Sequence, residues 1–229
     1  MRYAVITDVH ANVFALKAVL KEIDELKPDK IICLGDIVGG GAYPDETVQL
    51  IRKRPDILCV KGNHDMFVTL DLCKLPSVDT RIKMFAWQQK VLTKSAKAFL
   101  EGLPEKLEFD DCGKKIVAFH YPKNNKGRFK DLIYLPTEEQ VKELFAGLEG
   151  DVFLFGHEHT GSLTQIGDKH YLNFGTLGNM LEKDCARYGI LDVTEEKVTY
   201  KSLIATYDDT IPRKRMEEIY SLLGLEVRL

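Results

Sequence analysis

The sequence predicts an α/β protein, and two observations support this fold class. The first sixty residues alternate short apolar runs with stretches of helical period, which is typical of strands that pair in parallel through right-handed crossovers. The rest of the chain is richer in short apolar runs separated by turn residues. At 229 residues the chain is long enough for one large α/β domain and short for two. We therefore expect a single domain over 1–229.

The N-terminal region predicts strand, helix, strand, helix, strand. The helix expected over 12–26 has its apolar residues on one face, and Asn12 is suited to cap it. A second helix is expected over 46–52, entered through Pro44. The three apolar runs interpreted as strands are residues 3–7, 31–34 and 57–60.

Residues 66–104 are predicted to be mostly helical, with an interruption at Pro76. This stretch is expected either to complete the core or to cover the functional site. A further helix over 137–145 begins with a Thr137/Gln140 capping box. An amphipathic helix over 211–223 is expected to pack on its own domain or, as the alternative, on a second subunit. The remaining strands are predicted at 107–109, 116–119, 152–155, 163–166, 170–173, 188–193 and 198–204.

Composition narrows the classes of partner. The net charge of −3 gives no overall positive field of the kind that attracts nucleic acid or an anionic membrane. No stretch approaches the roughly 18–20 apolar residues of a transmembrane helix, and the N-terminal apolar run is too short for a signal peptide. No cysteine pair has Cys-x-x-Cys spacing, which favours buried free thiols in a cytoplasmic protein. The cysteines are Cys33, Cys59, Cys73, Cys112 and Cys185.

Polar residues with metal-binding chemistry follow five apolar runs. Because ligands of open α/β sheets bind at the carboxyl ends of strands, these residues are expected to meet at one sheet edge. Taken alone, several units have ordinary structural interpretations, and His170, which lacks such partners, is interpreted as structural. The units are Asp8-Val9-His10, Gly35-Asp36, Gly62-Asn63-His64-Asp65, His120 and Gly156-His157-Glu158-His159.

The combination predicts a metal centre. Asp8 and His10 are two residues apart, as are His157 and His159, so each pair would share a face of a continuing strand. The candidate ligands exceed the four of a tetrahedral zinc site and suit two divalent cations that share a carboxylate. Imidazole, carboxylate and amide donors without thiolate favour manganese, iron, zinc or nickel, with manganese expected first. The candidates are Asp8, His10, Asp36, Asn63, His120, His157 and His159.

Together these motifs resemble the calcineurin-like metallophosphoesterase superfamily, and the short chain with its Asp8-Val9-His10-Ala11-Asn12 opening is similar to the small prokaryotic phosphodiesterase branch. The resemblance implies a four-layer αββα sandwich of two mixed β-sheets flanked by helices, with the metals at the strand C-terminal ends. It implies that Asp36 bridges the two ions. One ion would be held by Asp8, His10, Asp36 and His159, and the other by Asp36, Asn63, His120 and His157.

The expected activity is hydrolysis of a phosphodiester by in-line attack of a metal-bridging hydroxide. The resemblance places His64 beside the leaving group, oriented by Asp65. Candidate substrate contacts, for a small phosphoester or nucleotide, are Asn12, Tyr121, Lys123 and Arg128.

Other functions remain as alternatives. The stretch Gly35-Asp36-Ile37-Val38-Gly39 lacks the arginine that protein serine/threonine phosphatases of the superfamily carry after Gly-Asp, which argues against that branch. A nucleotide or dinucleoside-polyphosphate hydrolase of the same fold is one alternative. A non-catalytic protein-interaction scaffold is another, and a homodimer is possible for any of them. No P-loop, Asp-x-Asp nucleophile or helical His-Glu-x-x-His motif is present.

Overall fold

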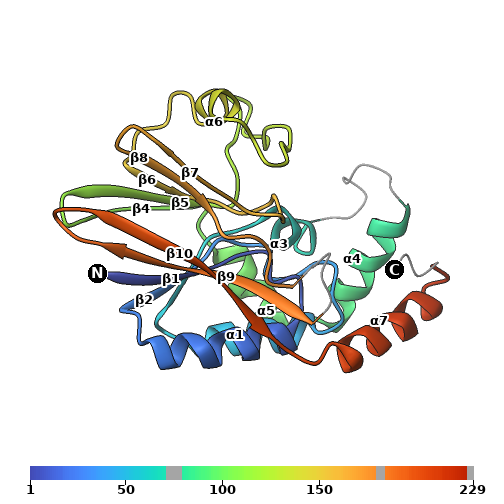
Figure 1. The fold of residues 1–229 in the computed structure, drawn as a ribbon. Coiled ribbons are helices and arrows are strands. Elements are labelled where there is room, and N and C mark those ends of the chain that lie inside the picture. The colour runs from blue at the N-terminus through green and yellow to red at the C-terminus, as the bar shows by residue number, and fades with distance from the viewer. Residues whose placement is uncertain (71–78, 179–183, 226–229) are drawn as a thin grey trace.

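The computed structural model describes residues 1–70, 79–178 and 184–225, with the backbone alone for 79–81. Helices and strands follow one another along the chain much as the apolar periodicity predicts (Figure 1). In order they are β1 (Arg2–Ile6), α1 (Val13–Leu26), β2 (Lys30–Cys33), α2 (Pro44–Arg52), β3 (Ile57–Cys59), α3 (Asn63–Phe67), α4 (Asp79–Val91), α5 (Lys94–Gly102), β4 (Lys106–Asp111), β5 (Lys114–Phe119), α6 (Glu138–Leu144), β6 (Val152–Leu154), β7 (Ser162–Ile166), β8 (Lys169–Asn173), β9 (Cys185–Val193), β10 (Val198–Thr206) and α7 (Thr210–Leu222).

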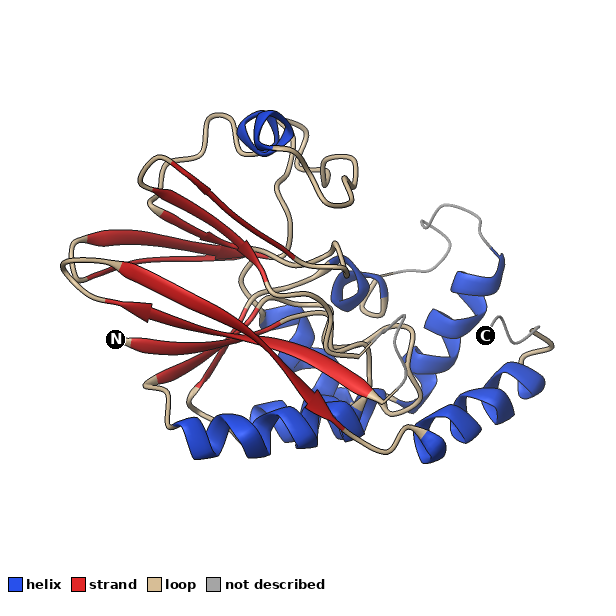
Figure 2. Ribbon diagram, viewed as in Figure 1, coloured by secondary structure: helices blue, strands red, loops and turns tan. Residues whose placement is uncertain are grey.

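The described strands form two mixed sheets of five strands each. The first has the order β10-β9-β1-β2-β3 and the second the order β4-β5-β6-β8-β7. In the first sheet β1, β2 and β3 are parallel, and β9 joins β1 antiparallel with Arg2 opposite Asp192. In the second, β5, β6 and β8 are parallel and hairpin partners flank them. The parallel strands of both sheets end at the same edge of the molecule (Figure 2).

The two sheets pack face to face with helices outside, which confirms the αββα sandwich. Alternation along β1 shows how the sequence builds these layers, because neighbouring side chains of a strand point to opposite faces. Tyr3 and Val5 join the apolar cluster between the sheets, while Ala4 and Ile6 join the cluster beneath the helices of the first sheet. A third cluster packs α6 against the outer face of the second sheet through Phe145. Strand β1 is therefore apolar on both faces.

Local signals in the sequence are confirmed at the helix ends. The side-chain oxygen of Asn12 accepts a hydrogen bond from the Ala15 N–H at the start of α1. Thr137 and Gln140 form the expected capping box at the start of α6. Pro44 opens α2 at its first turn, where its missing N–H costs nothing.

In the described part of the stretch after β3 there are three helices, α3, α4 and α5. Helices α4 and α5 pack against different parts of the protein. Helix α5 contributes Ala96 and Leu100 to the core beneath the first sheet. Helix α4 joins α7 in a small apolar cluster that contains Met84 and Ile219. The terminal helix therefore packs on its own chain through Ile219, while Leu222 is 75 % exposed. Pro76, predicted as an interruption, lies outside the described residues.

The described cysteines are free thiols. Cys33 and Cys59 are buried on paired positions of β2 and β3, as expected. Cys112 and Cys185 are only partly buried, because each lies at or beyond a strand end rather than inside an apolar run. Cys73 lies outside the described residues. Within the parts of the chain that the structure describes, no helix has the length and hydrophobicity to cross a membrane.

Candidate metal centre

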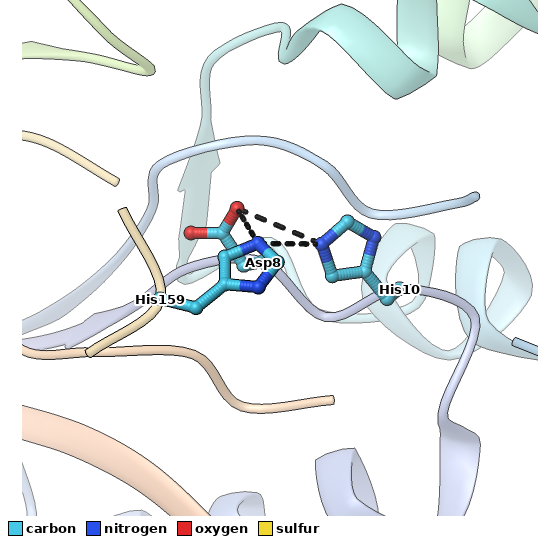
Figure 3. Close-up of side chains that lie close together, drawn as sticks. All are labelled: Asp8, His10 and His159. Carbon is cyan, nitrogen blue, oxygen red and sulfur yellow. Dashed lines mark hydrogen bonds and ion pairs between the residues drawn. The ribbon is translucent and has the colours of Figure 1, made fainter. Parts of the chain in front are cut away.

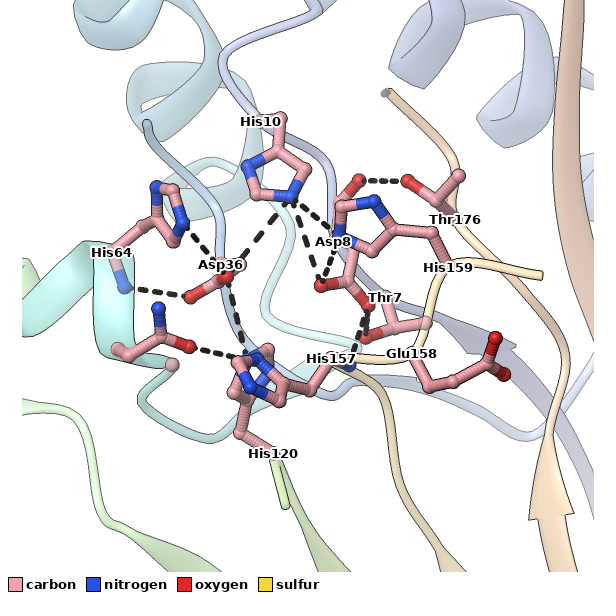
Figure 4. Close-up of polar contacts among 12 residues, drawn as sticks. Thr7, Asp8, His10, Asp36, His64, His120, His157, Glu158, His159 and Thr176 are labelled. Atoms are coloured by element: carbon pink, nitrogen blue, oxygen red, sulfur yellow. Dashed lines mark hydrogen bonds and ion pairs between the residues drawn. The ribbon is translucent and has the colours of Figure 1, made fainter. Parts of the chain in front are cut away.

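Imidazole, carboxylate and amide groups from loops after β1, β2, β3, β5 and β6 converge at one edge of the sandwich (Figure 4). All the ligand candidates of the sequence lie within this cluster. The histidines and aspartates form groups whose ligand atoms are close together, and Asn63 joins them through its contact with His120. Two groups of donors can be distinguished. Most of their side chains are buried, so their polar atoms face one another rather than bulk water.

The first group consists of Asp8, His10 and His159 (Figure 3). The Nε2 atoms of the two imidazoles are 3.1 Å apart. Asp8 Oδ1 lies 3.3 Å from Nε2 of His159 and 3.7 Å from Nε2 of His10. The other oxygen of Asp8 is already occupied, because it accepts hydrogen bonds from the Thr7 hydroxyl and the His157 N–H. Oδ1 is therefore the oxygen that Asp8 directs at the two histidines.

The second group consists of Asp36, Asn63, His120 and His157. Nε2 of His120 lies 2.9 Å from Asn63 Oδ1, 3.2 Å from His157 Nδ1 and 3.4 Å from Asp36 Oδ2. The other ring nitrogen of His120, Nδ1, lies 2.8 Å from the Leu34 carbonyl oxygen. A proton on Nδ1 donated to that carbonyl leaves Nε2 as the donor atom toward a cation.

Asp36 lies between the two groups. Its Oδ2 is 3.4 Å from Nε2 of His120 and 4.0 Å from Nε2 of His10, so one oxygen faces a ligand of each group. Its Oδ1 accepts a hydrogen bond from the His64 N–H at 2.8 Å, which fixes the carboxylate plane. This is the arrangement expected of a shared carboxylate.

These distances fit cations. Ligand atoms about 2.0–2.2 Å from a metal lie roughly 3–3.5 Å apart around tetrahedral or octahedral centres. Asp8 Oδ1 is moreover buried and faces the Nε2 atoms of His10 and His159. A cation between these atoms would satisfy the carboxylate oxygen and both imidazoles at once. The donors present therefore fit divalent metal ions, and the chain supplies their ligands.

The charges of the cluster favour a cation as well. Burial alone would raise the pKa of Asp36, but the charges of His120 and His64 outweigh it and hold that pKa well below its usual range. Burial would lower the pKa of His120, yet the charge and hydrogen bond of Asp36 raise it to about 9. Burial lowers the pKa of His10 to about 4, with the charge of His64 adding to the effect. The carboxylate of Asp36 thus stabilises positive charge placed beside it.

The backbone reaches this geometry through left-handed conformations. Asp8 and His10 have φ angles of 52° and 48°, and Asp36 and His157 have φ angles of 50° and 71°. The expectation that Asp8 and His10, and likewise His157 and His159, share a face of a continuing strand is therefore wrong, since β1 ends at Ile6 and β6 at Leu154. The two side chains meet because the chain coils sharply after the strand. Such conformations cost about 1–3 kcal/mol each and cluster at functional sites.

Neighbouring loops hold these strained turns in place. The N–H of Asp8 donates to the Gly35 carbonyl at 3.0 Å, and the N–H of His10 donates to the Asp36 carbonyl at 2.9 Å. The loops after β1 and β2 therefore run side by side, bonded through their backbones. Beyond β8, the Thr176 N–H donates to the His159 carbonyl and its hydroxyl donates to the Asp8 carbonyl.

Two glycines are required by close approach. A Cβ atom added to Gly62 would lie 2.1 Å from Oδ1 of Asp36, and one added to Gly156 would lie 2.0 Å from the Thr7 hydroxyl oxygen. Any larger residue would push the loops after β3 and β6 away from the carboxylates. The glycines that precede Asn63 and His157 therefore allow these loops to approach the carboxylates closely.

His64 lies at the rim of the cluster, 26 % exposed, with Nε2 3.8 Å from Asp36 Oδ2. Asp65, expected to orient the His64 ring, instead binds backbone groups. Its carboxylate accepts hydrogen bonds from the N–H groups of Gly62 and Val38, at 2.9 Å and 3.1 Å. Asp65 thus fixes the turn on which His64 stands, and its effect on the imidazole passes through the backbone.

The candidate substrate contacts differ in what they touch. The Asn12 amide N–H₂ donates to the Tyr207 hydroxyl at 2.9 Å, and its oxygen caps α1. Tyr121 is 2 % exposed, with its ring 5.0 Å from that of His157. Both side chains are thus engaged within the protein. Lys123 pairs with Glu105 at 2.8 Å. Arg128 is exposed and makes no side-chain ion pair among the described residues.

Several residues of the site were not predicted. Glu158 is buried between two ligands and accepts hydrogen bonds from the N–H groups of Thr160 and Gly161, so it shapes the His157–His159 turn. The ring of Phe129 stacks on His157 at a centroid distance of 5.7 Å. Glu158 lies within the Gly156-His157-Glu158-His159 motif, and that position is the signal that could have identified it. Phe129 carries no local signal.

Comparisons with known proteins agree with this geometry. The calcineurin-like phosphoesterase superfamily domain matches residues 1–196. The chain belongs to this superfamily. It is 35 % identical over 215 residues to the uncharacterised protein MJ0912 of Methanocaldococcus jannaschii, covering 85 % of this chain and 84 % of the relative.

Two solved structures share the fold of this chain. The chain is similar to a metallophosphoesterase from Sphaerobacter thermophilus, with a TM-score of 0.73, 25 % identity and 99 % of each chain covered. It is also similar to the hypothetical protein PH1004 from Pyrococcus horikoshii, with a TM-score of 0.84, 19 % identity and 97 % of each chain covered. Calcineurin-like phosphoesterases are generally metal-dependent hydrolases, which agrees with the donor groups described above.

Proposed function

We propose that this protein is a binuclear metal-dependent phosphodiesterase. The observation that carries the proposal is the pair of donor groups with Asp36 between them, its Oδ2 facing a histidine of each group. Asp8, His10, Asp36 and His159 would hold one ion, and Asp36, Asn63, His120 and His157 the other. Manganese is proposed first because hard and borderline donors are combined without thiolate.

When bound, the two ions would supply a nucleophile at neutral pH and neutralise the charge of the phosphoryl group. The residues of the chain would hold the ions, and hydrogen bonds fix the orientation of the ligand side chains. His120 is fixed by the Leu34 carbonyl and Asp36 by the His64 N–H, so the ligand atoms need little rearrangement. His64 stands at the open rim, where its imidazole can donate a proton or hydrogen bond to the leaving oxygen.

Metal removal tests the proposal. With manganese the protein is expected to hydrolyse bis-(p-nitrophenyl) phosphate, to lose that activity on treatment with a chelator, and to regain it when manganese is restored. Elemental analysis is expected to find two ions per chain. A protein that binds its metals and is inert toward phosphoesters with manganese, iron, zinc and nickel would instead be the non-catalytic scaffold. One ion per chain at saturation would contradict the binuclear centre.

A nucleotide or dinucleoside-polyphosphate substrate is the second candidate, favoured by the loop that follows β5. Residues 122–130 carry Lys123, Lys126, Arg128 and Lys130 and no acidic residue, in a chain of net charge −3. An isolated antiparallel β-bridge between the backbones of Lys123 and Phe129 closes the loop. The ring of Phe129 stacks on that of the metal-ligand candidate His157. The loop thus brings exposed positive charge beside the second donor group. We propose that Arg128 and Lys123 contact a further phosphate of the substrate.

Replacing Arg128 separates the two candidates. If the substrate carries extra phosphates, Arg128→Ala is expected to raise the KM for diadenosine tetraphosphate about tenfold, the effect of one charge-assisted hydrogen bond. Turnover of bis-(p-nitrophenyl) phosphate should not change. Arg215→Ala on α7, whose partner is Glu218, is the matched control. Equal KM values for the wild type and Arg128→Ala would argue against this contact.

We also propose a cytoplasmic location, since the described cysteines are free thiols of the kind that a reducing compartment maintains. Formation of a disulfide within the native protein isolated from cells would contradict it.

A further inference from the structure

The ring of His64 is held by packing rather than by hydrogen bonds. Nδ1 is buried and has no hydrogen-bond partner among the described residues. The ring meets those of His10 and Phe85 edge-on at centroid distances of 4.9 Å and 5.3 Å. The backbone of Gly39 closes another side, since a Cβ added there would lie 2.1 Å from Nδ1 of His64. The orientation of this imidazole therefore depends on where Gly39 and Phe85 stand.

Helix α4 places both of these neighbours. Phe85 belongs to α4, and Gln88 follows it by three residues, so the two side chains lie on one face of the helix. Gln88 is fully buried. Its Oε1 accepts a hydrogen bond from the Gly39 N–H at 2.8 Å, and its Nε2 donates to the Gly41 carbonyl at 2.9 Å. The Gln88 side chain thus forms hydrogen bonds to two backbone groups of the loop that packs against His64.

The rest of α4 is anchored to the C-terminal helix. Met84 and Trp87, which are three residues apart on α4, pack with Ile219 and Met216 of α7. The ammonium of Lys83 donates to the Leu223 carbonyl at 3.2 Å. The helix that carries Gln88 is therefore supported from the side away from the metal centre, and Figure 1 shows α4 and α7 side by side.

We infer that Gln88 is a positioning residue for His64. The inference rests on the proposed function, in which His64 assists departure of the leaving group. Gln88 fixes Gly39, and Gly39 with Phe85 confines the imidazole so that Nε2 faces Asp36 Oδ2 and the donor cluster. Asp65 secures only the backbone of His64, so the ring orientation is assigned to the face of α4. No signal within residues 79–91 separates Gln88 from an ordinary helical glutamine.

The test is Gln88→Met, which keeps the length of the side chain and its helix propensity but removes both hydrogen bonds. In folded, metal-saturated protein, kcat for bis-(p-nitrophenyl) phosphate is expected to fall about tenfold. For diphenyl phosphate, whose leaving group is more basic and depends more on proton donation, kcat should fall about 10²-fold. KM and metal content are expected to stay near those of the wild type.

The matched control is Gln89→Met on the same helix. The Gln89 amide donates to the Leu70 carbonyl at 2.8 Å, away from Gly39. It should leave both rates unchanged. Equal losses of Gln88→Met on the two substrates, or no loss, would overturn the inference. If Gln88→Met does not fold, Gln88→Asn replaces it, since its amide is polar but one methylene shorter and so withdraws the acceptor from Gly39; the same difference between substrates is required. A wild-type protein inert toward both diesters would instead refute the proposed function.

Discussion

Asp36→Asn is expected to abolish metal binding and activity together. The substitution keeps the shape of the side chain and the acceptor for the His64 N–H, but it removes the charge that faces both donor groups. The ions would then lose the carboxylate that the proposal makes them share. If the metals contribute several kcal/mol to transition-state stabilisation, kcat/KM should fall by about 10³-fold or more.

Elemental analysis and bis-(p-nitrophenyl) phosphate turnover measure these two losses in one preparation. Asp151→Asn is the matched control, because Asp151 lies at the opposite end of the second sheet, where it accepts a hydrogen bond from the Lys115 N–H. Circular dichroism must show that both variants are folded. Undiminished metal content in Asp36→Asn would rule out Asp36 as the bridging ligand.

His64→Ala is expected to separate metal binding from turnover. The His64 imidazole is 26 % exposed, and its Nε2 lies 3.8 Å from Asp36 Oδ2, farther than the 3.4 Å of the ligand candidate His120. Its loss should therefore leave two ions per chain and lower kcat by about 10²–10⁴-fold, the usual contribution of a general acid. The loss should be largest for substrates with basic leaving groups.

His170→Ala provides a histidine control, since that ring packs on Tyr200 between the sheets, away from the donor cluster. Steady-state kinetics with metal analysis of each preparation would check both variants. Full activity in folded, metal-loaded His64→Ala protein would remove the role proposed for His64. Loss of one ion would mean that His64 is itself a ligand, a possibility left by its nearness to His10 and Asp36.

The edge of the sandwich at which the metal-ligand candidates meet could be predicted, because these residues directly follow strands in the sequence. Asp8, Asp36 and His120 each stand within three residues of a buried apolar run, and parallel strands deliver such residues to one edge. Helix starts at Asn12 and Thr137 were readable from the residues that cap them. These features depend on short-range patterns, which a sequence displays directly.

Features that depend on contacts between distant segments could not be predicted. The coil that brings Asp8 and His10 together is stabilised by backbone bonds to the loop after β2, and nothing in residues 7–11 specifies that neighbour. Asp65 was expected to touch the adjacent imidazole, but its carboxylate bonds to the backbone of Val38 instead. Gln88 reaches Gly39 across 49 residues of sequence. Such roles follow from packing of elements, which periodicity does not encode.

The pairing of β1 with β9 has a consequence for biosynthesis. Arg2 is aligned with Asp192, so β1 leaves the ribosome well before β9 and receives this antiparallel neighbour only after the long intervening segment has been made. Until then one side of β1 offers unpaired N–H and C=O groups, a state open to wrong association. A nascent chain that has passed His159 already contains every metal-ligand candidate, yet the sheet that supports them is still incomplete. Closing this long loop is also expected to make folding slow.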